Sequence, residues 1–139
     1  SEQVAEVHRL LERYVNEQGQ MDVEKYLRIC EQLGEEPDPE RMPLDRSGFP
    51  EEVQVAFFIS DQISEKWDGM SGSYLGKNWL EAQELFKLYE IPNPKEILGF
   101  MQMHDMYLMK KRFEDGERRR KSKEKQSSGG KQYTHNVRG

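Results

Sequence analysis

The chain has one cysteine, Cys30, and this scarcity excludes an internal disulfide and any metal site built from several thiolates. It also lacks an apolar run long enough to span a bilayer, and its start shows no signal-peptide pattern. We therefore expect a protein that makes no membrane contact and works in a reducing, cytoplasmic setting. In that setting Cys30 is expected to be a buried, small apolar side chain.

Residues with the spacing of a catalytic or metal site are missing as well. The histidines, His8, His104 and His135, show no ligand spacing. His104 and Asp105 are adjacent, so on a helix their side chains diverge by about 100° and form no dyad. The acidic residues before the middle of the chain lack the rhythm of a calcium loop, and the glycines near the middle lack the end of a phosphate-binding loop. We expect no catalytic residue, no metal, no cofactor and no enzymatic activity.

Positive charge is scarce before residue 110 and abundant after it. Residues 110–139 hold 11 Lys and Arg against 4 acids, a net charge of +7, whereas the preceding 109 residues hold 10 basic and 22 acidic residues, a net charge of −12. Folding gives no reason for this segregation, because like charges on each side repel one another. The asymmetry therefore indicates a partner, or contact between the acidic body and the basic end.

Apolar residues at three- and four-residue spacing predict amphipathic helices over residues 2–17 and 22–33. Asp22 is suited to cap the start of the second helix, and Gly34 to end it. We expect the two helices to form an N-terminal helical hairpin over residues 1–34.

A proline-rich connector over residues 35–49 is predicted to lead into a central helical core over residues 50–117. The core begins with the most apolar helix of the chain, and further helices are expected at 80–89 and from about residue 94. A loop with glycines and two tryptophans, residues 67–79, joins them. Because no stretch shows the alternation of a strand, the predicted fold is all-α, a compact bundle of about five helices.

The Gly/Trp loop contains three glycines, Gly69, Gly72 and Gly76. Glycine loses more backbone freedom on folding than other residues, so a glycine-rich loop indicates a backbone that only glycine adopts easily. We expect at least one of the three to have a positive φ or to contact a tryptophan ring closely. At least one of the tryptophans is expected to pin the loop to the core.

The segment 118–139 is predicted to be a basic, low-complexity tail that is disordered or held by a partner. Its basic cluster, the predicted tail contact, comprises Arg118, Arg119, Arg120 and Lys121. Such a cluster suits salt-sensitive contact with nucleic acid. The tail has one aromatic residue, Tyr133, and lacks the interleaved aromatics that stack bases. A solubilising flexible end, or an end that folds back on the acidic body, are the alternatives.

Four methionines fall within nine residues of the last predicted helix: Met101, Met103, Met106 and Met109. Methionine side chains adapt to irregular apolar partners, and they also fill cores. We interpret the cluster as partly core and partly a surface that faces a partner.

Several local patterns occur together between residues 49 and 112. They are a helix with Gln54 after a proline start at Pro50, Trp67 followed by Gly-Met-Ser-Gly at 69–72, Tyr-Leu-Gly at 74–76, Leu-Tyr-Glu-Ile at 88–91, and the methionine-rich segment 100–106. In these features the chain resembles the small tail assembly chaperones of tailed bacteriophages. The resemblance implies a non-enzymatic protein of the host cytoplasm. Such a protein binds the long helical tape-measure protein and keeps it soluble until tail-tube subunits polymerise around it.

Under this hypothesis an apolar groove on the helical core binds the partner. The predicted groove residues are Phe57, Phe58, Trp67, Trp79, Met101 and Met106. Two alternatives stay open. One is a virion structural or connector protein whose basic tail contacts DNA or an acidic neighbour. The other is a transcription or replication accessory factor, and homo-oligomer formation is left open in every case.

Overall fold

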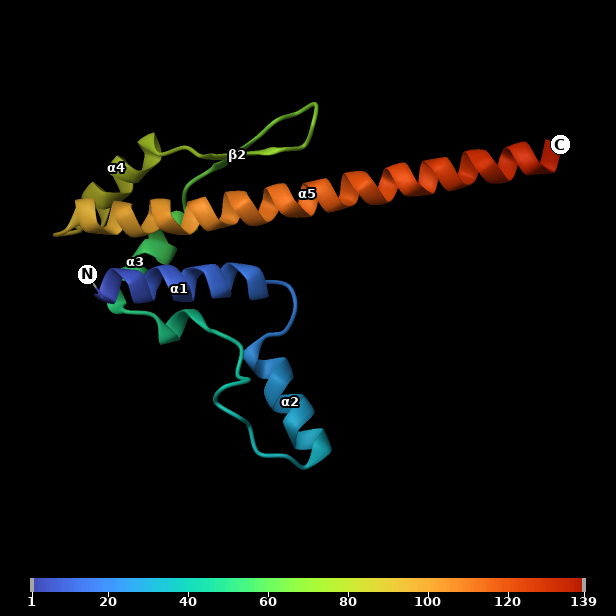
Figure 1. Cartoon of the computed structure of the whole chain (residues 1–139). Coiled ribbons are helices and arrows are strands. Elements are labelled where there is room, and N and C mark those ends of the chain that lie inside the picture. The colour runs from blue at the N-terminus through green and yellow to red at the C-terminus, as the bar shows by residue number, and fades with distance from the viewer. Residues whose placement is uncertain (1, 139) are drawn as a thin grey trace.

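The fold is mainly helical, as the sequence predicts. The computed structural model describes the backbone of residues 2–138 and the side chains of residues 2–127. Within this part the chain forms five α-helices, a short 3-10 helix and a two-stranded sheet (Figure 1). In chain order the elements are α1 (Glu2–Glu17), α2 (Val23–Leu33), the 3-10 helix η1 (Arg46–Gly48), α3 (Glu51–Ser60), β1 (Glu65–Trp67), β2 (Tyr74–Lys77), α4 (Leu80–Leu88) and α5 (Pro94–Arg138).

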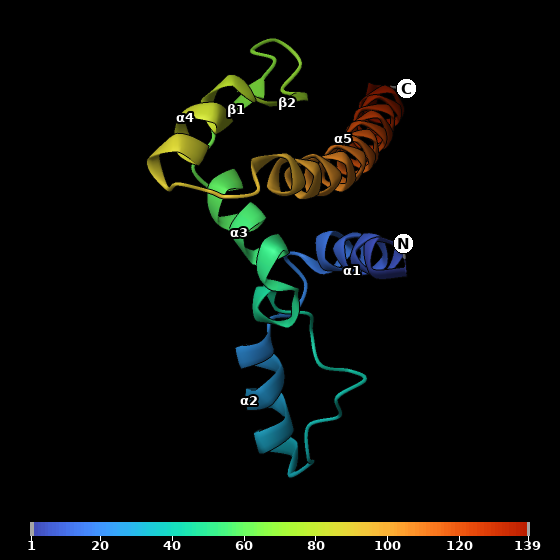
Figure 2. The same ribbon diagram turned by 90° about the vertical axis from the view of Figure 1, so that its left-hand side faces the viewer.

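Helix α3 is the central element, and its sequence is apolar around most of the helix. It packs across one side of α1 and α5, which run side by side in the same direction (Figures 1 and 2). Four apolar α3 side chains are at most 2% exposed: Val53, Ala56, Phe57 and Ile59. Because full burial of a large apolar side chain contributes about 1.5–3 kcal/mol, this short helix carries much of the driving force for folding.

The core consists of two adjoining clusters, and α3 contributes to both. The first joins α3 to α4 and the start of α5 and comprises Ala56, Ile59, Ile63, Ala82, Ile97 and Met101. The second joins α1 to α3 and comprises Val7, Leu11, Phe49, Val53 and Phe57. Phe100 of α5 packs against both clusters, so the two make one continuous core.

The segment between α2 and α3 is fastened to the core by Arg46. Its guanidinium pairs with Asp61 at 2.6 Å, donates to the hydroxyl of Tyr14 at 2.9 Å and lies 4.7 Å from the ring centroid of Phe57. These contacts hold the end of the predicted connector against α1 and α3. The earlier part of the connector is a loop that runs beside α2 (Figure 1).

Helix α2 has the caps that the sequence predicts but not the expected packing. The Asp22 carboxylate accepts a hydrogen bond from the backbone N–H of Lys25 at 2.7 Å, and Gly34 ends the helix with a φ of 71°. The helix points away from α1 (Figures 1 and 2), so the predicted hairpin over residues 1–34 is wrong. The reason is that α1 packs its apolar face on α3 and α5 instead. The predicted burial of Cys30 is confirmed.

An antiparallel hairpin occupies most of the predicted Gly/Trp loop, so the expectation of a fold without strands is wrong. Strand β1 pairs with β2 through Glu65 opposite Lys77 and Trp67 opposite Tyr74, with a bulge between them. Strands of three and four residues with a bulge are too short to show a regular alternation of apolar and polar residues.

The glycine prediction for this segment is confirmed. Gly72 has a φ of 72° and Gly76 a φ of 109°, whereas Gly69 is not among the residues with positive φ. Gly72 ends the turn between the strands, where its N–H donates to the carbonyl of Asp68 at 2.9 Å. The left-handed conformation at Gly72 lets the chain reverse and re-enter the sheet.

Helix α5 does not stop at residue 117, and in this respect the predicted disordered tail is wrong for the described part of the chain. Lys, Arg, Glu and Gln favour helix, and a helix already nucleated in the core extends without a second nucleation cost. Ion pairs one turn apart support the extension, since Asp115 lies 2.8 Å from Arg118 and Glu117 lies 2.7 Å from Arg120.

The far end of α5 projects beyond the body (Figure 1). The side chains of residues 128–139, among them Tyr133 and His135, lie outside the described residues. None of the helices over the described range combines the length and apolar character needed to cross a membrane.

Candidate partner-binding groove

The six residues predicted to line one apolar groove do not form one surface. Phe57 is 2% exposed and Met101 is 0% exposed, so both belong to the core and cannot contact a partner on this fold. Trp79 packs, partly buried, against the first core cluster, as expected for a tryptophan that pins the loop. Three of the six remain at the surface, each about half exposed, on three different elements: Phe58, Trp67 and Met106.

Phe58 lies in a small patch of its own. Its ring packs against Tyr89 in a T-shaped contact with 5.1 Å between centroids, and the Tyr89 hydroxyl donates to the side chain of Gln62 at 3.0 Å. This patch joins α3 to the end of α4, and the structure does not bring it together with Trp67.

Trp67 instead forms one wall of a groove of about 560 Å³ between the hairpin and α5, here called the hairpin–α5 groove. The hairpin side consists of Trp67, Tyr74 and the turn at 71–73. The α5 side presents Met109, Arg112, Phe113 and Gly116. Toward the C-terminal end of α5 the groove is lined by Glu117 and by three basic side chains, Arg119, Arg120 and Lys123.

Arg112 holds the two walls of this groove together. Its guanidinium lies 4.3 Å from the ring centroid of Tyr74 and 5.2 Å from that of Trp67. The same group donates two hydrogen bonds to the carboxylate of Glu65, at 3.2 and 3.4 Å. A partly desolvated cation on two aromatic rings contributes about 1–2 kcal/mol, so Arg112 is a clamp between α5 and the hairpin.

A second fastening lies beneath the hairpin, where polar side chains are buried. The Tyr74 hydroxyl donates to Asp105 of α5 at 2.6 Å, and burial, together with this carboxylate, raises the pKa of Tyr74. The ammonium of Lys77 donates to the carbonyl of Ser60 at 2.9 Å, at the C-terminal end of α3, where a cation is favoured by the helix dipole. Burial lowers the pKa of Lys77, and Glu65 and Asp105 oppose this effect.

His104 lies beside this buried polar group but takes no part in its hydrogen bonds. Its ring is 5% exposed and packs edge-on against Phe57 at 5.0 Å, and neither ring nitrogen has a hydrogen-bond partner among the described residues. Burial, reinforced by the charges of Lys77 and Arg46, lowers the pKa of His104 to about 4. His104 is therefore a buried residue whose side chain is neutral near pH 7.

The turn of the hairpin is organised by Asp68. Its carboxylate accepts hydrogen bonds from the Ser71 hydroxyl at 2.5 Å and from the Ser71 and Met70 backbone N–H groups at 3.3 and 3.4 Å. The Ser71 hydroxyl, followed by the two N–H groups, lowers the pKa of Asp68. The turn leaves Met70 99% exposed.

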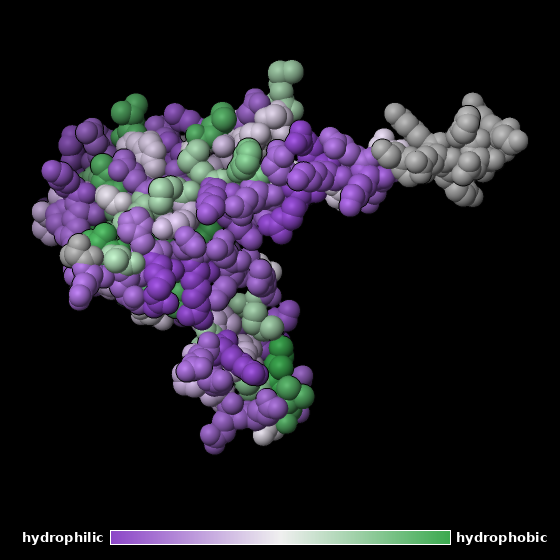
Figure 3. All heavy atoms as spheres, in the orientation of Figure 1, coloured by the Kyte–Doolittle hydropathy of each residue, from purple (hydrophilic) through white to green (hydrophobic). Residues whose placement is uncertain are grey.

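Helix α5 contributes an exposed apolar stripe to the groove and beside it. Met106, Met109 and Phe113 follow one another at spacings of three and four residues, so their side chains lie on one face of the helix. They are 51%, 42% and 68% exposed. The space-filling view shows hydrophobic surface on the hairpin side of the body, and an almost wholly hydrophilic surface where α5 leaves it (Figure 3).

The predicted basic contacts divide between two faces of α5. Arg119 and Arg120 line the groove, whereas Arg118 and Lys121 do not. Arg118 and Arg120 each pair with an acid one turn earlier in α5, which neutralises part of their charge. The sequence pattern did not separate these faces, although the spacing of residues 109, 113, 116 and 120 marks the groove side of the helix.

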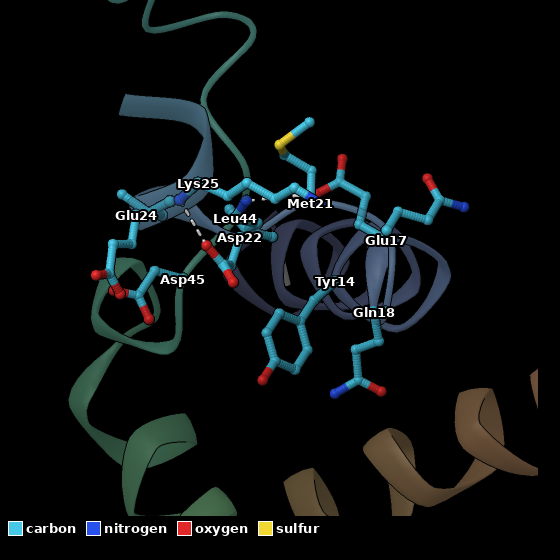
Figure 4. A pocket seen from close by; sticks show the side chains of 12 residues that line it. Tyr14, Glu17, Gln18, Met21, Asp22, Glu24, Lys25, Leu44 and Asp45 are labelled. Carbon is cyan, nitrogen blue, oxygen red and sulfur yellow. Dashed lines mark hydrogen bonds between the residues drawn. The ribbon is translucent and has the colours of Figure 1, made fainter. Parts of the chain in front are cut away.

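A second pocket, of about 570 Å³, lies at the junction of α1, α2 and the connector (Figure 4). Its lining mixes polar and apolar side chains and includes four acids, Glu17, Asp22, Glu24 and Asp45. The Asp22 carboxylate is already used as the cap of α2, as the dashed line in Figure 4 shows. The pocket therefore follows from the way α2 leaves the body.

Over the described part of the chain no three His, Cys, Asp or Glu side chains are grouped as metal ligands. Comparison with protein-family models, with curated proteins and with solved structures finds no match to this chain.

Proposed function

We propose that this chain is a non-enzymatic binding protein that holds an apolar helical segment of a partner in the hairpin–α5 groove. One observation carries the proposal. Trp67, Met109 and Phe113, which are 49%, 42% and 68% exposed, meet at one concave surface. Large apolar side chains grouped in this way mark interaction sites, and methionines suit partners of variable shape.

The partner that we propose is the tape-measure protein of a tailed bacteriophage, with this chain acting as its chaperone in the host cytoplasm. The support is the resemblance of residues 49–112 to tail assembly chaperones, together with the groove. A long helical protein with apolar stripes aggregates unless those stripes are covered. The acidic body supplies the charge that keeps such a complex soluble, because residues before 110 carry a net charge of −12.

The test is co-expression of the chain with the tape-measure protein, followed by measurement of how much tape-measure protein stays soluble and is captured. Phe113→Ser removes the most exposed apolar side chain of the groove, and we expect it to abolish most of the solubilisation. Phe58→Ser is the matched control, because Phe58 is 52% exposed and lies outside the groove. Equal loss in both variants, or no capture by the unaltered chain, would contradict the proposal.

Two further measurements follow from an apolar mode of binding. Capture should persist at about 0.3 M salt. Exposed charge pairs are screened over less than about 8 Å under these conditions, whereas the apolar contacts that hold the partner are not weakened by screening. Purified virions should not contain the chain, because a chaperone leaves when tail-tube subunits assemble.

The basic face of α5 beyond the body favours a second candidate, a virion structural protein or accessory factor that contacts nucleic acid. Arg118, Arg119, Arg120 and Lys121 are exposed there. Replacing Arg118 and Lys121 with Ala, which keeps the two arginines that line the groove, separates the candidates. Unchanged partner capture supports the chaperone, whereas lost binding to DNA, with a steep salt dependence in the unaltered chain, supports the second candidate.

A further inference from the structure

The hairpin–α5 groove has an open notch at Gly116. Along α5 the groove side runs through Met109, Phe113, Gly116 and Arg120 at spacings of four, three and four residues. A Cβ atom built at Gly116 meets no other atom within 4 Å. The missing side chain therefore leaves space between Phe113 and Arg120 in which a partner side chain can sit. Anchors repeated at such spacings match those of an amphipathic helix lying in a groove.

The opposite wall of the groove is fixed. Trp67 is held by Arg112 and packs against Tyr74 with 5.0 Å between ring centroids. Glu65 accepts from the Trp67 indole N–H at 3.2 Å as well as from Arg112. Because the wall is already held in place, a partner that enters the groove does not have to order it, which reduces the entropic cost of binding.

The charge at one end of the groove is opposite to that of the body. Arg119 and Lys123 line this end, and neither forms a salt bridge among residues 2–127, while Arg120 is paired with Glu117. The rest of the chain, before residue 110, has a strong excess of acids. An acidic partner segment is therefore repelled by most of the molecule and attracted at this site.

We infer that the groove selects an amphipathic helix whose apolar ridge is bordered by Asp or Glu side chains. The ridge lies on Met109, Phe113 and the notch at Gly116, and the acids face Arg119 and Lys123. The inference rests on the proposed function, since it specifies the segment of the partner that the groove holds. Apolar contact gives most of the affinity, and the charged border gives orientation and selectivity.

Single-stranded nucleic acid also combines negative charge with flat apolar groups, so it is the alternative to an acidic helix as the occupant of the groove. It needs aromatic faces that are free to stack on bases. Trp67 and Tyr74 pack against each other, and Arg112 lies over both rings with its charge paired to Glu65. Among the described aromatic side chains of the groove only Phe113 makes no ring contact, and a single free ring beside Met109 suits side chains of a helix better than a run of stacked bases, so a protein segment is favoured.

The experiment uses the full chain and three fluorescent probes in anisotropy titrations. The first two are synthetic amphipathic peptides of about 20 residues with Leu at helical spacing, one bordered by Glu and one by Lys, and the third is oligo-dT. We expect the Glu peptide to bind at least about tenfold more tightly than the Lys peptide, and Arg119→Glu with Lys123→Glu to reverse that preference. Equal affinities for the two peptides, failure of both to bind, or tighter binding of oligo-dT would overturn the inference.

Gly116→Leu tests the notch. A side chain at this helical position meets no steric conflict and favours the helix, so the variant folds but fills the notch. We expect Gly116→Leu to weaken the Glu peptide at least about tenfold, and Gly99→Leu, at an exposed glycine of the same helix, to leave binding unchanged. If the tape-measure protein is captured but neither Gly116→Leu nor the charge reversal affects it, the inference fails and the proposed function stands. If the peptides behave as expected but the tape-measure protein is not captured, the partner is wrong and the specificity of the groove stands.

Discussion

The hydroxyl of Tyr74 in the hairpin donates a 2.6 Å hydrogen bond to the carboxylate of Asp105 in α5, and Asp105 is only 5% exposed. This bond joins the second strand of a short sheet to the helix that carries the opposite wall of the groove. A two-stranded hairpin is marginally stable by itself. Its position, and with it the shape of the groove, therefore depends on contacts with α5 such as this one.

Tyr74→Phe removes this donor and leaves the buried Asp105 carboxylate with one hydrogen-bond partner fewer. We expect the free energy of unfolding to fall by about 1–3 kcal/mol, measured by urea denaturation. Tyr89→Phe is the control, because the Tyr89 hydroxyl bonds to Gln62 at the surface. If the two variants have the same stability, the hairpin is not held by Asp105.

Replacing each of the three loop glycines by alanine should change the stability of the fold by a different amount. Gly72→Ala and Gly76→Ala place a Cβ on backbones with φ of 72° and 109°, and we expect each to destabilise the fold by about 1–2 kcal/mol. Gly69 is not among the residues with positive φ, and a Cβ there meets nothing within 4 Å, so Gly69→Ala should change the urea midpoint little. Loss of stability in Gly69→Ala alone would contradict the observed turn.

His104 makes stability depend on pH in a definite direction. In the unfolded chain its pKa is near 6.5, whereas in the fold burial lowers the pKa to about 4. As pH falls from 7 to 5 the unfolded chain takes up a proton that the folded chain does not, so stability is present above pH 6.5 and is lost on acidification. The expected loss from pH 7 to pH 5 is about 2 kcal/mol.

His104→Leu should remove most of this pH dependence, since the apolar replacement fills the same buried site without titrating. Urea unfolding at several pH values between 5 and 7 measures it, in a range above most carboxylate titrations. A variant that keeps the full slope would show that another group is responsible.

Deleting residues 122–139 should leave the stability of the body unchanged within about 1 kcal/mol and reduce the helical circular dichroism signal. The segment contains one aromatic and one aliphatic side chain, Tyr133 and Val137, which is too little apolar area to add to the core of the body. A larger shift of the urea midpoint would show that the end of α5 contacts the body. An unchanged dichroism signal would show that the segment is not helical in solution.

Helices with one apolar face and clear end signals could be predicted from the sequence. Asp22 and Gly34 bound α2 as expected, and α1 covers the predicted residues 2–17. The sequence could not show which of two adjacent apolar residues in a helix is buried. Phe57 and Phe58 are adjacent in a helix that is apolar nearly all round, yet one is 2% and the other 52% exposed. Only the positions of α1 and α5 decide which of the two is buried.

The groove was beyond sequence reasoning for a similar reason. Trp67 and Phe113 are 46 residues apart, and they line one surface because a bulged hairpin folds over α5. Nothing in the sequence spacing of Glu65, Tyr74 and Arg112 indicates that these residues hold the hairpin against α5. The Ser and Gly residues beyond position 121 predict disorder, yet α5 continues through them because helix already formed in the core extends with little cost.

Because α5 is one continuous helix, its core segment, its groove segment and its basic end share a single screw axis. Each residue advances 1.5 Å and turns 100°, so Lys125 stands about 24 Å along the axis from Met109. The direction in which the basic end faces about the helix axis is thus set by the number of residues between it and the groove. One inserted residue beyond the groove would rotate the basic end about the helix axis by more than a quarter turn. Seven inserted residues would return it nearly to its original orientation, about 10 Å farther along the axis.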